Sequence, residues 1–433
     1  MGGWGRSVIA VAMLFSAVTG VARAETIEAQ SGIEIVSERA INEFPRGVTF
    51  SIELRADAPP DEVRLRYELA PDGTGASAVA DCSGTTTITC SHTLISGNGI
   101  FVIPGAEITY YWEIRPTEGE STETVEQLYV HEDTRFTFET VTSGNVTVYY
   151  HSGLVSQAEA VLQASMGSIA STGELLQTEV GFPVKVFLYT TAEEMQPAIV
   201  PGGGRGVAIL GEVVYSDTAM VSADVATLDI ARHELAHIVT REASKGPFGL
   251  PDWLNEGISV FQQSQPLSGH GAALESAIAR DRVLTMVQLN SSAAGDTADT
   301  VGLYYGQAGS IVRYLVETYG AEEFAELVAT FKEGSRPDAA FEAVYGFDQL
   351  GLENEWRASV GLSPRAASAT STPRAADDDA TATPRTGSVG QDNGNADGGG
   401  MSVVTVAIIV ALTALALAAL GGLGLAVARR TGG

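Results

Sequence analysis

The sequence contains little cysteine and few basic residues, and each shortage limits what the protein can be. Among 433 residues the only cysteines are Cys82 and Cys90, so a zinc site built from cysteine ligands is excluded. Lysine and arginine total 25 against 53 aspartates and glutamates, which gives a formal net charge of -28. A surface this acidic argues against nucleic acid and anionic lipid headgroups as partners. The charge does not identify a substrate, and it can simply keep an exported protein soluble.

Residues 1–24 have the pattern of a secretory signal peptide. Arg6 precedes a mostly apolar run from Ser7 to Val21, and Ala22-Arg23-Ala24 fits the small-x-small rule for cleavage. We therefore expect this segment to be removed on export. An uncleaved N-terminal membrane anchor is the alternative, and it is disfavoured because the apolar run is short and is followed by a good cleavage site.

The C-terminal end carries a second apolar segment, residues 401–428, which is long enough to span a membrane. It contains no charged residue from Ser402 to Ala428, and about 20 apolar residues suffice to cross a bilayer as a helix. Arg429 and Arg430 follow directly, and such residues stay on the cytoplasmic side. We therefore expect a single-pass protein of the cell membrane, with an extracellular body and a cytoplasmic tail of residues 429–433. A buried core helix is disfavoured because the segment is apolar on every side.

Residues 363–400 connect the body to this segment. They are mostly Ala, Ser, Thr, Pro, Asp and Gly without apolar periodicity, which predicts a disordered linker. Because the body is expected outside the cell, where disulfides persist, we predict that Cys82 and Cys90 form a disulfide.

The body divides into two predicted domains, residues 25–142 and residues 143–362. The first has short runs of alternating apolar and polar residues, such as Val48–Leu54, separated by turn residues. This pattern predicts a β-sandwich. Its histidines, His92 and His131, are isolated and indicate no chemistry.

The second predicted domain mixes strands with helices. Val146–Tyr150 and Val184–Leu188 are predicted strands, and apolar residues at helical spacing predict helices over Leu154–Val180 and Val225–Thr240. Further predicted helices follow toward residue 344. The fold class is therefore α+β, with a β-sandwich first and with the helices of the second domain mostly after its strands.

His233-Glu234-Leu235-Ala236-His237 is a candidate metal site. Residues four apart lie on the same face of a helix, so both imidazoles can bind one metal ion. Glu234 is placed to take a proton from a water molecule at the metal instead of binding it. The alternative is that two of the six histidines fall at this spacing by chance. Apolar neighbours that can bury the rest of this helix, such as Ile238, argue against chance.

Glu256 is the candidate third ligand. Eighteen residues separate it from His237, and it lies within Leu250–Gly257. Pro251 marks a turn, and a helix is expected directly after it. A carboxylate in the first turn of that helix can face the two histidines and complete a three-ligand site with one open position.

Other third ligands are less suitable. Glu242 lies on the same predicted helix as the histidines and points away from them. Thr240 and Ala243 stand where the metzincin pattern has Gly and His, which excludes that class. His270 is possible but has no motif around it.

This arrangement resembles the gluzincin zinc peptidases. The histidine pair, the eighteen-residue spacer and Trp253-Leu254-Asn255-Glu256-Gly257 are similar to the bacterial peptidase MA-like group and to the related catalytic domain of M1 aminopeptidases. The resemblance covers about Val146 to Gly361. It implies a thermolysin-like fold, one Zn²⁺ per chain, and hydrolysis of peptide bonds in a peptide or protein substrate.

The resemblance also implies roles for individual residues. His233, His237 and Glu256 would bind zinc, which lowers the pKa of its water toward about 7, and Glu234 would act as general base and then as acid. Tyr304–Arg313 is similar to the segment in which such enzymes hold a transition-state tyrosine, which implies that Tyr305 stabilises the oxyanion with zinc. Tyr305 and its neighbour can also be core aromatics.

Two departures from the family pattern matter. The Gly-x-Met-Glu-Asn strand that holds a substrate amino terminus in the M1 family is absent, and the strand-like run Val207–Tyr215 offers only Glu212 as a carboxylate. We therefore predict an endopeptidase, whose substrate pairs with this strand. Val260 stands where thermolysin-like enzymes have an aspartate that orients a zinc histidine, so the residues that orient the histidines stay unassigned.

Two other functions stay open. One is a non-catalytic binding protein at the cell surface that keeps a peptidase fold, against which the intact set of Glu234 and three ligands speaks. The other is a zinc hydrolase of non-peptide bonds, which the sequence does not separate from a peptidase. No pattern indicates an oligomeric state.

Overall fold

The computed structural model describes most of the body of the protein. The predicted signal peptide, the predicted cytoplasmic tail, nearly all of the predicted linker and most of the predicted membrane segment lie outside the described residues. The described residues are 32–71, 73–96, 101–199, 208–264, 268–291, 300–365 and 406–410.

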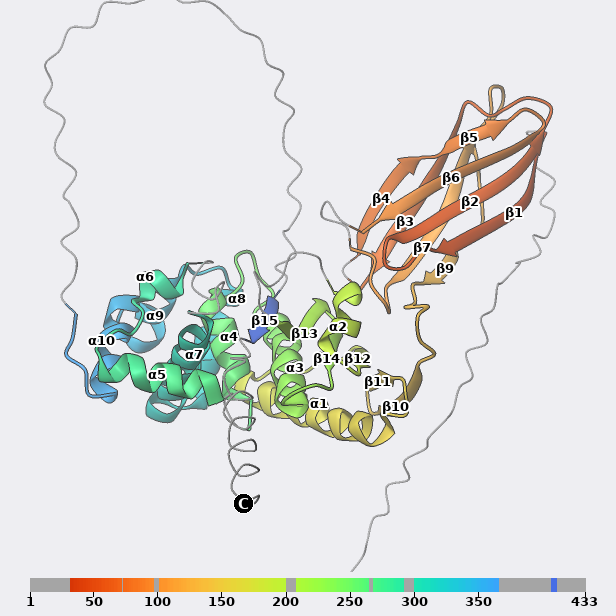
Figure 1. Ribbon diagram of the computed structural model, residues 1–433. Coiled ribbons are helices and arrows are strands. Elements are labelled where there is room, and N and C mark those ends of the chain that lie inside the picture. The colour runs from red at the N-terminus through yellow and green to blue at the C-terminus, as the bar shows by residue number, and fades with distance from the viewer. Residues whose placement is uncertain are drawn as a thin grey trace, which may run out of the picture.

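The N-terminal part of the described chain consists of two antiparallel β-sheets (Figure 1). Their strand orders are β1-β2-β6-β5 and β4-β3-β7-β8, with β9 also paired to β7. Alternating apolar residues from both sheets form one core, in which the rings of Phe50 and Tyr110 lie 4.4 Å apart. The strands are β1 (Ile33–Asn42), β2 (Gly47–Ala56), β3 (Glu62–Ala70), β4 (Thr74–Val79), β5 (Asp81–Gly84), β6 (Thr87–Ile95), β7 (Glu107–Arg115), β8 (Thr122–Glu123) and β9 (Gln127–Val130).

The predicted disulfide is confirmed. Cys82 on β5 and Cys90 on β6 lie directly opposite each other in the strand pair, and their sulfur atoms are bonded. Within the described residues neither His92 nor His131 belongs to a cluster that could hold a metal ion.

A third, mixed sheet follows, with the strand order β10-β11-β12-β14-β13-β15. The pairs β11/β12 and β12/β14 are parallel and the others are antiparallel. β10 belongs to this sheet, although residues 139–142 fall in the first of the two predicted domains. The strands are β10 (Glu139–Ser143), β11 (Val146–Tyr150), β12 (Val184–Tyr189), β13 (Ala208–Tyr215), β14 (Thr218–Ser222) and β15 (Val406–Val410).

Helices occupy most of the described chain between β14 and β15, which confirms a mixed α and β fold with β-sheets in the N-terminal part. α1 and α3 pack against the sheet, where Val161 and Ile230 share a core with Val148 and Val186. α3 begins later than the sequence predicts, because Ala226 adopts a left-handed conformation, with φ of 51°, just before it. The helices are α1 (Val155–Leu176), α2 (Ala192–Met195), a 3₁₀ turn η1 (Gln196–Ala198), α3 (Thr227–Ala243), α4 (Asp252–Phe261), α5 (Ser268–Ala279), α6 (Met286–Leu289), α7 (Val301–Tyr319), α8 (Ala321–Lys332), α9 (Pro337–Tyr345) and α10 (Gln349–Ser359).

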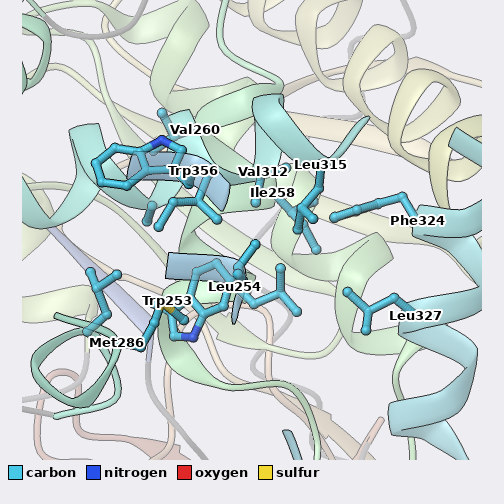
Figure 2. Close-up of a cluster of buried hydrophobic side chains, with 14 of the residues drawn as sticks. Trp253, Leu254, Ile258, Val260, Met286, Val312, Leu315, Phe324, Leu327 and Trp356 are labelled. Atoms are coloured by element: carbon cyan, nitrogen blue, oxygen red, sulfur yellow. The ribbon is translucent and has the colours of Figure 1, made fainter. Parts of the chain in front are cut away.

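The C-terminal helices form their own apolar core (Figure 2). Trp253 and Leu254 extend from α4 into this core, where Leu315 of α7 and Trp356 of α10 also lie. Trp253, Leu254 and Leu315 are fully buried, so α4 is anchored by the two residues at its start. This anchoring fixes the first turn of α4, which carries Glu256.

The structure differs from the predicted membrane helix in the five residues of that segment that it describes. Val406–Val410 form β15, antiparallel to β13, with Gly211 opposite Ile408. Apolar and β-branched residues suit a strand, and the edge of β13 presents backbone N–H and C=O groups that such a strand can pair with. Among the helices of the described ranges, none combines the length and the apolar character needed to cross a membrane.

The two N-terminal sheets and their loops contact the mixed sheet directly. Nζ of Lys185 on β12 donates hydrogen bonds to the carbonyl of Gly105 at 3.1 Å and to Oε1 of Glu107 at 2.6 Å. The hydroxyl of Tyr215, at the end of β13, donates to the carbonyl of Phe101. β13 is therefore held at one end by a contact with the N-terminal part of the chain.

Candidate metal centre

Helix α3 provides two of the candidate ligands. His233 and His237 lie one turn apart, and their exposed fractions are only 1% and 3%. Ile230 and Leu235, also on α3, are buried in the core shared with the sheet. The helix is thus packed on several sides, and both imidazoles are held in the protein interior.

Helix α4 provides the third. It starts directly after Pro251, as the sequence predicts, and Glu256 is buried. Its Oε2 lies 3.1 Å from Nε2 of His233 and 3.5 Å from Nε2 of His237. The structure therefore brings together the three residues that the sequence pattern selected.

The three side chains fit a metal ion. One ligand atom from each of His233, His237 and Glu256 lies within 4.8 Å of the others, and Nε2 of His237 makes no hydrogen bond to any described residue. Burial lowers the pKa of His233 to about 4. Burial by itself raises the pKa of Glu256, but the neighbouring His237 and His233 lower it to about 2. Neutral imidazole and ionised carboxylate are the forms that bind zinc.

Glu234 lies beside this group and is fully buried. Neither of its carboxylate oxygens has a hydrogen-bond partner of good geometry within the described residues. Burial, and then the negative charges of Glu256 and Glu212, raise the pKa of Glu234 well above its ordinary value. A buried carboxyl group with a raised pKa is suited to accept and return a proton near neutral pH.

Gly211 allows β13 to approach Glu234. A Cβ atom at position 211 would lie 2.7 Å from Oε1 of Glu234 and 2.5 Å from Cγ2 of Ile230. Any other residue would push either the strand or the glutamate side chain away. The strand and the candidate catalytic carboxylate are thus in direct contact.

The structure identifies partners of the two histidines that the sequence leaves unassigned. Nδ1 of His237 lies 3.0 Å from Oγ of Ser259 and 3.1 Å from Oδ1 of Asn255. Nδ1 of His233 lies 3.4 Å from the side-chain amide of Gln263. An N–H of His237 directed at Asn255 leaves Nε2 free to bind a metal ion. All three partners lie on α4 or just after it, and none of them is charged.

Tyr305 lies on α7 and is 4% exposed. Its ring centroid is 6.1 Å from that of His233, in an edge-on arrangement. The neighbouring Tyr304 is also buried, with its ring centroid 5.5 Å from that of Tyr305. The structure thus places Tyr305 next to a candidate metal ligand.

The carboxylate of Glu256 and the imidazoles of His233 and His237 are a donor set typical of zinc hydrolases. The buried Glu234 beside them is placed as a general base would be in such a site. Residues 163–361 match a family model described as Peptidase MA superfamily. This match supports a region like the peptidase MA and gluzincin families, and it points to a hydrolase of the metallopeptidase type. It does not bear on the M1 aminopeptidases specifically.

The other comparisons add little. A comparison with curated proteins gives no match. Solved structures that match include one titled "Crystal structure of Br derivative BhCBM56", with 10% sequence identity and a TM-score of 0.17 over 24% of this chain and 96% of that chain. A likeness at that TM-score supports no argument about fold or function.

Proposed function

We propose that this protein is a zinc-dependent metallopeptidase with a thermolysin-like catalytic domain. The observation that carries the proposal is the convergence of His233, His237 and Glu256 beside the buried carboxyl group of Glu234. His233, His237 and Glu256 would hold one zinc ion, which when bound supplies Lewis-acid chemistry for hydrolysis of an amide bond.

The protein's own residues would divide the remaining work. Glu234 takes a proton from the attacking water and delivers it to the nitrogen of the leaving group, for which its raised pKa is suited. Tyr305 donates a hydrogen bond to the oxygen on which negative charge develops. Ser259 and Asn255 hold the ring of His237 in one orientation through its Nδ1.

We further propose that the enzyme is an endopeptidase. β13 lies against Glu234 through Gly211, and its outer edge pairs with the extended segment Val406–Val410. This pairing supports the proposal, because an edge that accepts one extended strand can accept a substrate strand in the same way. A substrate bound along β13 would run past the metal centre on both sides.

A second candidate is an aminopeptidase, and one observation favours it. Glu212, the next residue after Gly211, is completely buried, and its charge acts on Glu234. A carboxylate so close to the centre could bind the ammonium group of a free amino terminus. Two peptides that share one internal bond separate the candidates, one with an acetylated and one with a free amino terminus. Internal cleavage of the acetylated peptide supports an endopeptidase, whereas stepwise release of residues from the free peptide alone supports the aminopeptidase.

We also propose that the protein is exported and held at the cell membrane by residues 401–428. Insertion of this segment into a bilayer would withdraw Val406–Val410 from β13 and leave the edge of β13 to substrate. Protease added to intact cells should then release the body by cutting within residues 363–400. A body that stays protected in intact cells would reverse this topology.

The experiment for the catalytic proposal uses the full chain, purified with and without added zinc. Zinc content is measured by plasma mass spectrometry, and cleavage of an unfolded protein is followed by mass spectrometry of the products. One zinc per chain together with cleavage at internal bonds supports the proposal. Bound zinc without cleavage of any protein or peptide would favour a binding protein or a hydrolase of other bonds.

A further inference from the structure

α5 and α7 approach each other closely beside the metal centre. A Cβ atom at Gly306 of α7 would lie only 2.4 Å from the carbonyl oxygen of His270 on α5. A Cβ atom at Gly302, one turn earlier on α7, would lie 3.4 Å from the carbonyl oxygen of Gly269. This close approach of the two backbones at the glycines of α7 brings the first turn of α5 against Tyr305.

The imidazole of His270 stacks on the ring of Tyr305. The ring centroids are 5.3 Å apart and the planes differ by 14°. Tyr305 in turn meets His233 edge-on, at 6.1 Å and 64°. His270, Tyr305 and His233 therefore form a continuous series of three rings that ends on a candidate metal ligand.

In the described part of the chain, one ring nitrogen of His270 lacks the hydrogen bond that usually holds a structural histidine. His270 is only 5% exposed, yet its Nδ1 has no hydrogen-bond partner within the described residues. A buried polar atom without a partner is unfavourable. Burial also lowers the pKa of His270 to about 4, so the ring is neutral at physiological pH. The identified contact that orders this ring is its stack on Tyr305.

We propose that His270 is a positioning residue that fixes the ring of Tyr305 at the metal centre and thereby sets the oxyanion contact. The inference rests on the proposed peptidase function, in which Tyr305 donates to the developing charge. Without the stack, the phenol ring gains freedom to rotate away from His233. A donor displaced by even a fraction of its hydrogen-bond length loses most of its effect on the transition state.

The kinetic test compares His270→Ala, which removes the stacking ring, with His270→Phe, which keeps a ring without its nitrogens. His270→Ala should lower kcat on the order of tenfold or more with little change in KM, and His270→Phe should restore most of the rate. Leu274→Ala, also on α5 but outside the stack, is the control for disturbed helix packing. If His270→Phe is as impaired as His270→Ala, the ring nitrogens matter and the positioning role is wrong.

A double-mutant cycle with Tyr305→Phe tests the route through which His270 acts. If His270 acts only through the phenol hydroxyl, His270→Ala should have no further effect on kcat in the Tyr305→Phe background. If the double variant loses the product of the two single reductions in kcat, the proposal is contradicted. Loss of bound zinc from His270→Ala would also contradict it, because either result gives His270 a role apart from Tyr305.

Fluorine NMR of protein labelled with 3-fluorotyrosine separates this inference from the proposed function. The signal of Tyr305, assigned by its loss in Tyr305→Phe, should shift or broaden in His270→Ala and keep its sharpness in His270→Phe and Leu274→Ala. An unchanged signal in His270→Ala would show that the stack does not order Tyr305, whether or not the protein cleaves peptides. A changed signal in a protein that cleaves nothing would support the positioning of Tyr305 while the peptidase function fails.

Discussion

Oε2 of Glu256 lies 3.1 Å from Nε2 of His233, and this contact joins helices α3 and α4 at the candidate metal centre. The carboxylate is ionised and the imidazole neutral, because the pKa of Glu256 falls to about 2 and that of His233 to about 4. In these protonation states both groups offer lone pairs that a divalent cation between them would bind.

The first prediction concerns zinc binding. His237→Ala and Glu256→Ala should each lose the zinc that the unaltered protein retains through dialysis, because two remaining ligands hold the ion only weakly. Glu242→Ala, on the same helix but outside the donor group, is the control and should keep its zinc. Normal zinc content in Glu256→Ala would remove Glu256 as the third ligand.

The second prediction concerns the partners of His237. Ser259→Ala should reduce zinc affinity, and the double variant Asn255→Ala, Ser259→Ala should reduce it more, by about 10- to 100-fold, as is usual when the partners that orient a ligating histidine are lost. The reason is that both side chains lie at Nδ1 of His237, so either one can partly replace the other. Competition with a fluorescent chelator measures the affinity. Equal zinc affinity in the double variant and the unaltered protein would show that neither contact orients the ring.

The third prediction concerns Tyr305. Tyr305→Phe should raise the activation free energy by about 3 kcal/mol and lower kcat accordingly, which is the usual effect of one lost oxyanion donor. Its zinc content should be unchanged. Tyr304→Phe is the matched control, since its ring is buried beside Tyr305. A loss of rate in Tyr304→Phe and not in Tyr305→Phe would move the role to the neighbouring residue.

The fourth prediction concerns acid stability. His131 is completely buried, and burial lowers its pKa to about 4, whereas in the unfolded chain it is about 6.5. Between these values the unfolded chain binds more protons, so the stability that the neutral ring preserves is fully present above pH 6.5 and is lost as pH falls toward 4. Protonation of His131 should lower the free energy of unfolding by about 3 kcal/mol at pH values near 4 and below.

Urea unfolding at a series of pH values tests this effect. His131→Gln should flatten the decline of the unfolding free energy between pH 6.5 and pH 4, even if it lowers stability overall. His92→Gln, at a half-buried site on β6, should change the slope less. A slope that is the same in His131→Gln and the unaltered protein would assign the acid sensitivity to other groups.

Local patterns in the sequence predicted much of the candidate site. The four-residue spacing of His233 and His237 requires only a regular helix, and Pro251 marks the start of α4 within a few residues of Glu256. Alternation of apolar and polar residues predicted the β-sheets of the N-terminal part. The expected export to an oxidising compartment predicted the disulfide between Cys82 and Cys90. Each of these features depends on residues that are near in sequence or on composition.

Contacts that depend on how separate helices pack could not be predicted in this way. Ser259 and Gln263 are ordinary polar residues in the sequence, and they gain a role only because α4 lies against α3. His270 had no motif around it, and its stack on Tyr305 depends on the close approach of α5 at Gly306. The pairing of Val406–Val410 with β13 joins segments that are nearly 200 positions apart. An apolar run such as residues 401–428 is compatible both with a strand and with a membrane helix, so its composition did not predict this pairing.

The most direct test of the catalytic account is the turnover of Glu234→Gln. This substitution keeps the size and shape of the side chain but removes its ability to accept a proton. We expect Glu234→Gln to bind one zinc per chain with unchanged affinity and to lose nearly all cleavage of an unfolded protein. A Glu234→Gln protein that binds zinc and cleaves at the rate of the unaltered chain would contradict the mechanism.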